Sequence, residues 1–432
     1  MQLTHKKNIA QALAIASCGL VNPVAEAATD DRFFSGWDID AALMYYGEQD
    51  RVQAIEAIGD FQKQYDDESQ LNLKVVFDSL TGASASGAVA QSQHQTFTRP
   101  SGDGQYIVGA GDTPLDDSFK DTRLQLSANW IEQLSLEWQS NIGVYGSREF
   151  DYTSLGVNGG IERSLNKDNT TLAISAAYTY DLLEPVGAKP VPLSAMAIRQ
   201  DFISEQAFRQ AFNLTRGDDS DDKQTLDLIL GLTQIINANW LMQFNYGLSS
   251  VAGYLTDPYK ILSVVDNSGT SQQYRYEHRP DSRLKHSLFA LAKGVVAGDI
   301  VDISYRYNSD DWDINSHTFD GHYRHYFSDD FYGQLHLRYY LQSAAEFYQP
   351  FLLMGSILPE YASADYRIGE MTTYTFGIKF GHKLKGDHEL SYRLEWYQQT
   401  PKNNGTALVG QLQQHELFPS LTAVIAQVSY SF

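Results

Sequence analysis

The chain has 432 residues, with 53 Asp and Glu against 32 Lys and Arg, and a formal net charge of −21. So acidic a protein is a poor partner for nucleic acid, because the phosphates would repel it. Its mean hydropathy is −0.35, and no run of about eighteen apolar residues follows the N-terminal segment, which excludes a membrane protein built from helices. A β-barrel is compatible with this hydropathy because only alternate residues of each spanning strand face lipid.

The first residues predict a secretory signal peptide over 1–27, which leaves 28–432 as the mature domain. Two lysines precede an apolar core at 9–21, and the small-x-small cleavage pattern lies at 25–27. The residues before Cys18 also fit a lipoprotein cleavage box, which would leave Cys18 lipidated. Cys18 is the one cysteine of the chain, so a mature domain without it has no disulfide, thiol chemistry or Cys-ligated metal.

From Phe33 onward, segments with alternating apolar and polar side chains recur, each followed by a turn. Leu335 and Leu337, for example, alternate with His336 and Arg338, and this period of two is the pattern of a strand with two unlike faces. The expected strands are 37–46, 53–65, 69–80, 120–131, 134–147, 152–166, 170–180, 222–234, 240–256, 283–295, 298–308, 313–327, 331–343, 371–384, 388–398 and 421–432. The fold class predicted is all-β, a transmembrane antiparallel β-barrel of about 16 strands.

The connections between these strands sort by length. Every second connection is tight, and the others include all the long ones, 81–119, 181–221, 257–282, 344–370 and 399–420. Short periplasmic turns and long extracellular loops are the asymmetry of outer-membrane barrels, and they require an even number of strands. We therefore expect the protein in the cell outer membrane, with both termini in the periplasm.

Two segments depart from plain alternation. Residues 313–327 have mixed faces, which predicts a β-bulge near Gly321. Residues 191–212 carry apolar side chains at helical spacing, among them Phe202 and Phe208, which predicts a short helix within the long loop that folds into the barrel mouth or over it.

The last strand ends the chain on Tyr430 and Phe432, which lie in one row with apolar alternate residues. A soluble protein gains little from an exposed terminal aromatic residue, although an edge strand of a soluble sheet would show the same alternation. In a membrane barrel these rings would lie at the periplasmic interface. We expect Tyr430 and Phe432 to act as the assembly signal for the barrel-assembly machinery.

The polar row of each expected strand faces the barrel lumen, and it carries charges of both signs. The lumen-lining residues proposed to set selectivity are Lys74, Arg123, Glu137, Asp302, Arg306, His336, Arg338, Lys379, Arg393 and Glu395, with Asp78 and Asp227 beside them. Opposite charges on neighbouring strands would create a transverse field that orients a polar solute. They would equally form salt bridges that plug a closed barrel, so the pattern leaves both interpretations open.

Sites of other chemistry are weakly supported. The acidic loop 216–222 lacks the ordered spacing of a calcium loop and is more typical of a solvated surface. His317, His322 and His325 suggest a transition metal, but His322 and His325 point to opposite faces of one strand. No catalytic signature is evident, so we expect no enzyme activity, no catalytic residues, no metal and no cofactor.

The loops carry strings that resemble one bacterial family. They include residues 78–84, 121–123, 149–152, 253–260, 279–283, 311–312, 316–318 and 338–348, and the string Tyr254-Leu255-Thr256-Asp257-Pro258-Tyr259-Lys260 is the most specific. They resemble an outer-membrane family of unknown function, domain-of-unknown-function family three-five-seven-zero, over nearly all of the mature chain. This resemblance implies a barrel and no established activity.

Two functions follow as hypotheses. A width of about sixteen strands favours a porin-like channel or transporter for small polar solutes or ions, and for such a barrel we expect a homotrimer surrounded by outer-membrane lipid. The alternative is a closed barrel that acts as a scaffold or surface-interaction partner, for instance of extracytoplasmic redox proteins, because its loops are longer than a simple pore needs.

Overall fold

The computed structural model describes residues 36–65, 69–386 and 388–432. The signal peptide predicted at 1–27, including Cys18, lies outside the described residues and stays a prediction. None of the helices in the described part of the chain is long and apolar enough to cross a membrane.

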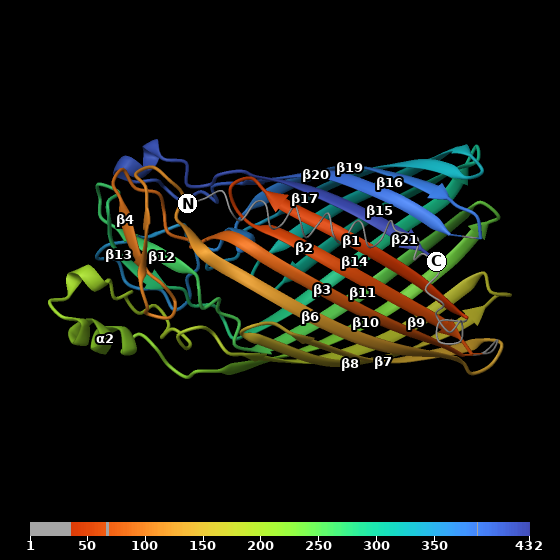
Figure 1. The fold of residues 1–432 in the computed structure, drawn as a ribbon, viewed down its shortest axis with the longest axis horizontal. Helices are drawn as coiled ribbons and strands as arrows, with labels where there is room; N and C mark the ends of the chain where they lie inside the picture. Colours follow the sequence, from red (N-terminus) through yellow and green to blue (C-terminus); the bar gives the residue numbers. More distant parts are fainter. Residues whose placement is uncertain (1–35, 66–68, 387) are drawn as a thin grey trace, which may run out of the picture.

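Sixteen antiparallel strands close into one barrel, in which β1 pairs with both β2 and β21 (Figure 1). Going round the ring, they are β1 (Trp37–Glu48), β2 (Gln53–Gln64), β3 (Ser69–Ala85), β6 (Leu115–Gln133), β7 (Trp138–Arg148), β8 (Tyr152–Leu165), β9 (Thr170–Leu183), β10 (Asp221–Asn237), β11 (Trp240–Gly253), β14 (Ser282–Val296), β15 (Asp299–Asp310), β16 (Asn315–Ser328), β17 (Phe331–Gln342), β19 (Met371–Lys383), β20 (Glu389–Pro401) and β21 (Leu421–Ser431). The predicted fold class and strand number are confirmed.

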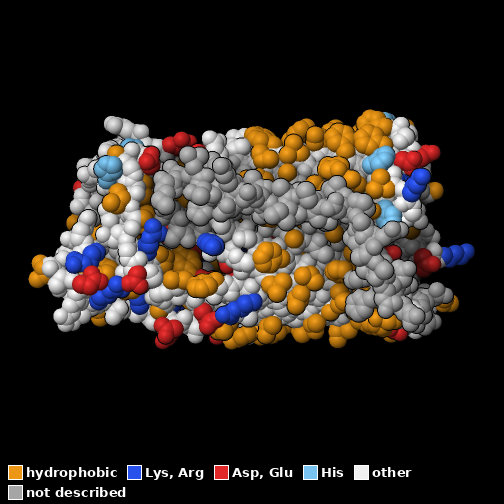
Figure 2. All heavy atoms as spheres, in the orientation of Figure 1, with side chains coloured by type: hydrophobic (Ala, Val, Ile, Leu, Met, Phe, Trp, Pro, Cys, Tyr) orange, Lys and Arg blue, Asp and Glu red, His pale blue; other side chains and the backbone are white. Residues whose placement is uncertain are grey.

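The two ends of the barrel differ as the sequence predicted. At one end, the end of the short turns, the seven connections are two to five residues long. At the other end lie all the long connections. The strands between them expose apolar side chains outward, such as Leu126, Ile303 and Leu337, which are 52%, 63% and 60% exposed. Figure 2 shows hydrophobic side chains gathered along the barrel where the grey atoms leave it visible, the arrangement that a lipid environment requires.

The long connections fold together into a small domain over one end of the barrel (Figure 1). We call this domain the cap, and it comprises residues 86–114, 184–220, 254–281, 343–370 and 402–420. Its elements are β4 (Gln95–Thr98), β5 (Gln105–Val108), η1 (Arg199–Asp201), α2 (Glu205–Asn213), β12 (Ile261–Val265), β13 (Ser271–Tyr276), β18 (Leu352–Leu353), η2 (Tyr366–Ile368) and η3 (Gly410–Gln414).

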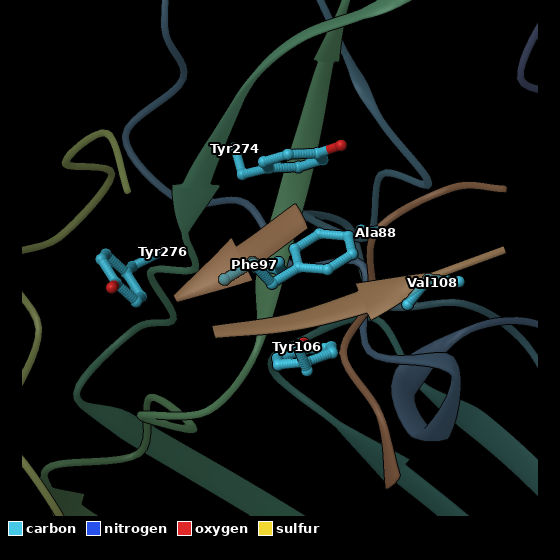
Figure 3. Packing of buried hydrophobic residues seen from close by; sticks show 7 residues of the cluster. Ala88, Phe97, Tyr106, Val108, Tyr274 and Tyr276 are labelled. Carbon is cyan, nitrogen blue, oxygen red and sulfur yellow. The ribbon is translucent and has the colours of Figure 1, made fainter. Parts of the chain in front are cut away.

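The cap has its own hydrophobic core. Phe97 on β4 is fully buried between Tyr106 of β5 and Tyr274 of β13, with ring centroids 5.1 and 4.7 Å away (Figure 3). Ala88 and Ile261 complete this cluster from two different loops. Burial of large aromatic rings supplies most of the driving force for packing such short elements. The loops therefore cooperate as one folded unit.

Residues 134–137 form a turn, whereas the alternation of Leu134, Leu136 and Trp138 predicted a strand from 134. The amide of Leu134 donates to the carbonyl of Trp138 at 2.8 Å, and the amide of Trp138 donates to the carbonyl of Ser135 at 3.2 Å. These bonds close the chain on itself, so β7 begins only at Trp138. A short alternating run cannot distinguish a strand end from the turn that follows it.

The helix predicted over 191–212 is confirmed only in its second half. Helix α2 begins after Ser204, whose side chain accepts a hydrogen bond from the amide of Ala207, as a helix N-cap does. Before it, Pro192 and the positive φ of Leu193 (52°) are incompatible with a continuous helix. Those residues lie along the cap instead, where the amide of Met196 bonds Tyr274.

The bulge predicted near Gly321 is wrong. The pairing of β16 with both neighbours runs through Gly321 without a register shift. A shift does occur at the end of the strand, between Tyr326 and Ser328, where β16 turns into β17. The mixed faces of this strand instead reflect polar side chains in the lumen and aromatic side chains on the outer surface.

Candidate functional site: the charged lumen beneath the cap

A row of charged and imidazole side chains crosses the inner wall of the barrel. Asp302 of β15, His322 of β16 and His336 of β17 are direct cross-strand partners, and the row continues through Gly377 of β19 to Glu395 of β20. Because directly opposed residues share one face of a sheet, all of these positions face the lumen. We call Asp302, His322, His336 and Glu395 the His–carboxylate row.

Each imidazole of the row is held by a carboxylate of its own. His322 Nδ1 lies 2.8 Å from Asp302 Oδ1, and His336 Nδ1 lies 2.9 Å from Glu395 Oε1. The two rings stack with centroids 4.3 Å apart and 13° between their planes. Asp320, two residues before His322, lies 3.2 Å from His336 Nε2 and 3.5 Å from His322 Nδ1, so one carboxylate contacts both rings.

Gly377 allows this arrangement. It lies between His336 and Glu395 in the row, and a Cβ at this position would come within 2.8 Å of Glu395 Cγ. Because glycine has no side chain, Glu395 extends across β19 to reach His336 two strands away. A larger residue would block this path, so the glycine is needed for space and not for backbone conformation.

A basic row lies next to the His–carboxylate row, nearer the short turns. Arg324, Gln334, Lys379, Arg393 and Gln427 are successive cross-strand partners. Side chains of both rows line a cavity of about 300 Å³, among them His322, His336, Lys379, Arg393 and Glu395, and Arg338 lines it as well. Arg338 Nε donates to Asp320 at 2.5 Å. The structure thus brings five of the predicted lumen-lining residues into one cavity.

The opposite wall carries a second group of charges. β3 and β15 are eight places apart in the ring of sixteen strands, and Lys74 and Asp78 of β3 face the lumen there. Arg123 Nε of β6 donates to Asp78 at 2.7 Å, and Arg123 also lies 3.9 Å from Glu56. The predicted side chains Lys74 and Arg123 are therefore in the lumen, but on a different wall from the cavity of His336.

Arg306 lies on β15, the strand that also carries Asp302 of the His–carboxylate row. Its guanidinium is 5.3 Å from the ring centroid of Phe289 on β14. Within the described residues it makes no salt bridge with a carboxylate, unlike Arg123 or Arg338. A lumenal cation that lacks an ion pair is free to interact with a passing anion.

Glu137 is a correction, because it does not line the lumen. It lies in the 134–137 turn and pairs with Arg163 at 3.2 Å, where both side chains are well exposed. The error follows from reading 134–147 as one strand.

Asp320 and His322 are lumenal side chains that the sequence-based selection left out. Their alternate spacing on a strand was a usable signal. His317 and His325 lie on the outer face with Tyr305 and Phe327, whereas the neighbour of His322 is His336 on the next strand.

The cap contains a buried network of charges that the sequence did not predict. Arg279 donates to Glu277 at 2.6 Å and to Asp365 at 2.7 Å, and the carboxylate side chains are 0% exposed. Arg367 also binds Asp365, at 2.8 Å, and its guanidinium reaches Asp257 at 2.5 Å. This network joins the loop 254–281 to the loop 343–370.

Burial and charge act in opposite directions on the two buried carboxyl groups. Burial raises the pKa of Glu277 to about 7, although Arg279 beside it favours the charged form. Burial would raise the pKa of Asp365 as well, but Arg367 and Arg279 together hold the pKa of Asp365 far below its usual range. Asp257 and Arg279, from the strings that suggested the family, thus take part in the network that stabilises the cap.

The last strand closes the barrel as predicted, because β21 pairs with β20 on one side and β1 on the other. The amide of Phe432 donates to the carbonyl of Ile39 at 2.8 Å. Its ring packs against Tyr430 with centroids 4.6 Å apart, at the end of the short turns. The role of Tyr430 and Phe432 as an assembly signal stays a prediction.

Comparison with solved structures finds barrels of very different sequence. A bacterial polysaccharide outer membrane secretin aligns with a TM-score of 0.43 and 8% identity, over 92% of this chain and 99% of that chain. The CymD monoaromatic hydrocarbon channel aligns with a TM-score of 0.39 and 8% identity, over 96% and 92%. The siderophore receptor PirA from Acinetobacter baumannii aligns with a TM-score of 0.41 and 9% identity, over 85% of this chain and 53% of that chain. The chain thus spans about half the length of that receptor.

No curated protein matches the chain by sequence. A family model, in contrast, matches residues 10–432, which is nearly the whole chain, and its description reads "Protein of unknown function (DUF3570)". The resemblance seen in the loop strings is thereby confirmed, and this chain, which folds as a closed sixteen-stranded barrel, belongs to that family.

Proposed function

We propose that the protein is an outer-membrane channel that passes small polar solutes or ions through its charged lumen, while the cap limits entry from outside. The observation that carries this proposal is the arrangement of lumenal charge. Both walls carry charges of both signs, and most of these charges are paired, as Arg123 is with Asp78 and Arg338 is with Asp320. Arg306 of β15, in contrast, makes no salt bridge among the described residues and lies against Phe289. A lumenal cation without an ion pair can attract a passing anion or orient a polar solute.

Cavities on both walls support this proposal. One cavity of about 300 Å³ lies at His336 and the basic row. Another, of about 590 Å³, lies on the other wall and is lined by Arg123, Glu149 and Asp181. A salt-bridged plug would fill such spaces with paired side chains, whereas a solute path needs room beside the charges.

Reconstitution in planar bilayers tests the channel. Folded protein, verified by its heat-modifiable migration, should give discrete conductance steps, and Arg306→Glu should shift the permeability ratio towards cations. Lys167→Glu is the matched control, because it makes the same change of charge in an exposed turn at the barrel end. A folded barrel that stays silent over a range of voltages and salts would refute the proposal.

The second candidate is a closed barrel that displays the cap as a scaffold or interaction surface, for instance for extracytoplasmic redox proteins. The cap favours it, because a simple pore needs no loop domain with a core of its own. Ile107, Ile203 and Ile357 on the cap are 71%, 103% and 97% exposed, and exposed apolar side chains are common at docking surfaces.

Cross-linking in intact cells followed by purification under gentle detergent tests this candidate. Recovery of one partner in stoichiometric amount, lost in an Ile203→Ser/Ile357→Ser variant, would support it. Recovery of no partner from cells that express both proteins at natural levels would count against it.

A further inference from the structure

Three side chains of the lumen bring possible metal-ligand atoms close together. Asp320, His322 and His336 each have a ligand atom within 4.8 Å of the other two. Asp320 and His322 are two residues apart on β16, and His336 is the direct cross-strand partner of His322. Two imidazoles and one carboxylate are ligands suited to Zn²⁺ and other divalent transition metals.

We propose that Asp320, His322 and His336 bind one divalent transition-metal ion inside the barrel, with Asp302 and Glu395 holding the two imidazoles in position. The proposal goes beyond the channel function and does not depend on it, because a closed barrel would hold the ion equally well.

The hydrogen bonds of the row prepare the imidazoles for metal binding. Asp302 and Glu395 each lie within 2.9 Å of an Nδ1 atom, at His322 and His336 respectively. A carboxylate at Nδ1 keeps the proton on that nitrogen and leaves Nε2 as the ligand atom. At His336 this Nε2 lies 3.2 Å from Asp320, the carboxylate that would share the ion. Two carboxylate–histidine pairs lie side by side here. A salt-bridge network that only stabilises the barrel wall would not need this arrangement.

Charge favours a bound cation at this cluster. The carboxylates Asp302, Asp320 and Glu395 face two guanidiniums, Arg338 at 2.5 Å from Asp320 and Arg393 at 3.7 Å from Glu395. Three carboxylates against two guanidiniums leave an excess of negative charge, which attracts a cation.

The site is reachable from the lumen. His322 and His336 line the cavity of about 300 Å³, and the side chains of His336 and Asp320 keep 12% exposure. Three protein ligands leave at least one coordination position of a tetrahedral ion for water or a solute.

Metal titration of the purified full-length protein tests the proposal. The protein for this titration should be purified with an affinity tag that contains no histidine, because a histidine tag would itself bind Zn²⁺. It should be treated with a chelator beforehand to remove bound metal. Zn²⁺ in isothermal titration calorimetry should bind with one equivalent per chain, and Co²⁺ should give visible d–d absorption that Zn²⁺ abolishes. Ca²⁺ should not compete, because the site offers nitrogen ligands to a metal that prefers oxygen.

Variants locate the ion. His322→Gln and His336→Gln should each weaken Zn²⁺ binding by more than about 10-fold, the lower limit seen even for loss of a group behind the ligands. His325→Gln is the matched control, because this histidine of the same strand also contacts a carboxylate, Asp299 at 2.9 Å, but on the outer face. It should leave the affinity unchanged.

Arg338→Gln provides a test with the opposite sign. Because Arg338 competes for the carboxylate of Asp320, its removal should tighten Zn²⁺ binding, which a purely structural ion-pair network would not show. Heat-modifiable migration verifies folding of each variant. No stoichiometric Zn²⁺ binding, or binding that survives both histidine variants, would overturn the proposal.

Discussion

Arg279 joins two loops of the cap, and its replacement by methionine should open the cap while the barrel stays folded. Its guanidinium donates to Glu277 at 2.6 Å and to Asp365 at 2.7 Å. The two carboxylates come from different loops, so the arginine links these loops, beside the contacts of Ser363 with Glu277 and of Arg367 with Asp257. Arg279→Met removes this link and leaves buried carboxylates behind.

Removal of one partner from a buried ion pair costs about 3–5 kcal/mol. We expect the lower end of this range, because Glu277 retains a hydrogen bond at 2.5 Å from Ser363 Oγ and one at 2.6 Å from the amide of Asp257, while Asp365 retains Arg367. A loss of about 3 kcal/mol multiplies the population of the open cap by roughly 100.

The loss of cap stability in Arg279→Met should depend on pH. Burial raises the folded-state pKa of Glu277 to about 7, which is above its value in an unfolded chain. The folded cap therefore favours the protonated form of Glu277, and the stability of the cap falls as pH rises through about 7. In the variant without Arg279, the charged form of Glu277 has also lost its main partner. The defect of Arg279→Met should therefore be larger near pH 8 than near pH 5, and adding Glu277→Gln should recover part of it.

Limited proteolysis of the folded barrel measures cap opening. Cleavage within residues 254–281 and 343–370 should accelerate in Arg279→Met, while heat-modifiable migration stays normal. The control is Arg209→Met on α2, whose pairs with Glu205 and Asp103 are exposed and contribute little. Equal cleavage rates in the two variants would refute the reasoning.

Three further predictions concern the lumen and the barrel end. Gly377→Ala places a Cβ against Glu395 and should lower the free energy of unfolding in urea by about 1–3 kcal/mol. The double variant Gly377→Ala/Glu395→Ala should recover this stability, and an unchanged urea midpoint in Gly377→Ala would contradict this role of the glycine. Burial and a hydrogen bond that protonated Glu149 donates to Asp121 raise the pKa of Glu149 to about 7, so selectivity for cations should increase from about pH 6 to about pH 8, and Glu149→Gln should remove this dependence. Deletion of Phe432 should slow insertion and yield periplasmic, protease-sensitive protein; a normal outer-membrane yield at low expression would show that its ring is dispensable.

The sequence by itself determined the barrel. Alternation of side chains reports which residues face lipid, because a strand has a period of two and lipid admits only apolar groups. This local signal placed Arg338 and Arg393 in the lumen and located all sixteen strands. It failed at Glu137, because alternation continues into a turn when the turn residues happen to match.

Only the tertiary structure decided which lumenal residues meet. A two-residue turn at 329–330 would pair His322 with Leu337 if the register continued unbroken, and the shift between Tyr326 and Ser328 makes His336 its partner instead. Glu395 and His336 lie two strands apart in the ring. Their contact depends on Gly377, which lies between them and has no side chain to block it. Such contacts join residues far apart in the chain, and one residue of slippage in the register abolishes them.

The folding of the cap depends on tertiary structure to an even greater degree. Phe97, Tyr106 and Tyr274 lie in loops whose sequences show no period, and their packing follows from the barrel that brings the loop ends together. Once the strands fix those ends, the entropy cost of gathering the loops falls, and burial of the aromatic rings is enough to fold them as one unit. Local sequence patterns carry no record of this cooperation, because each loop contributes only part of the core.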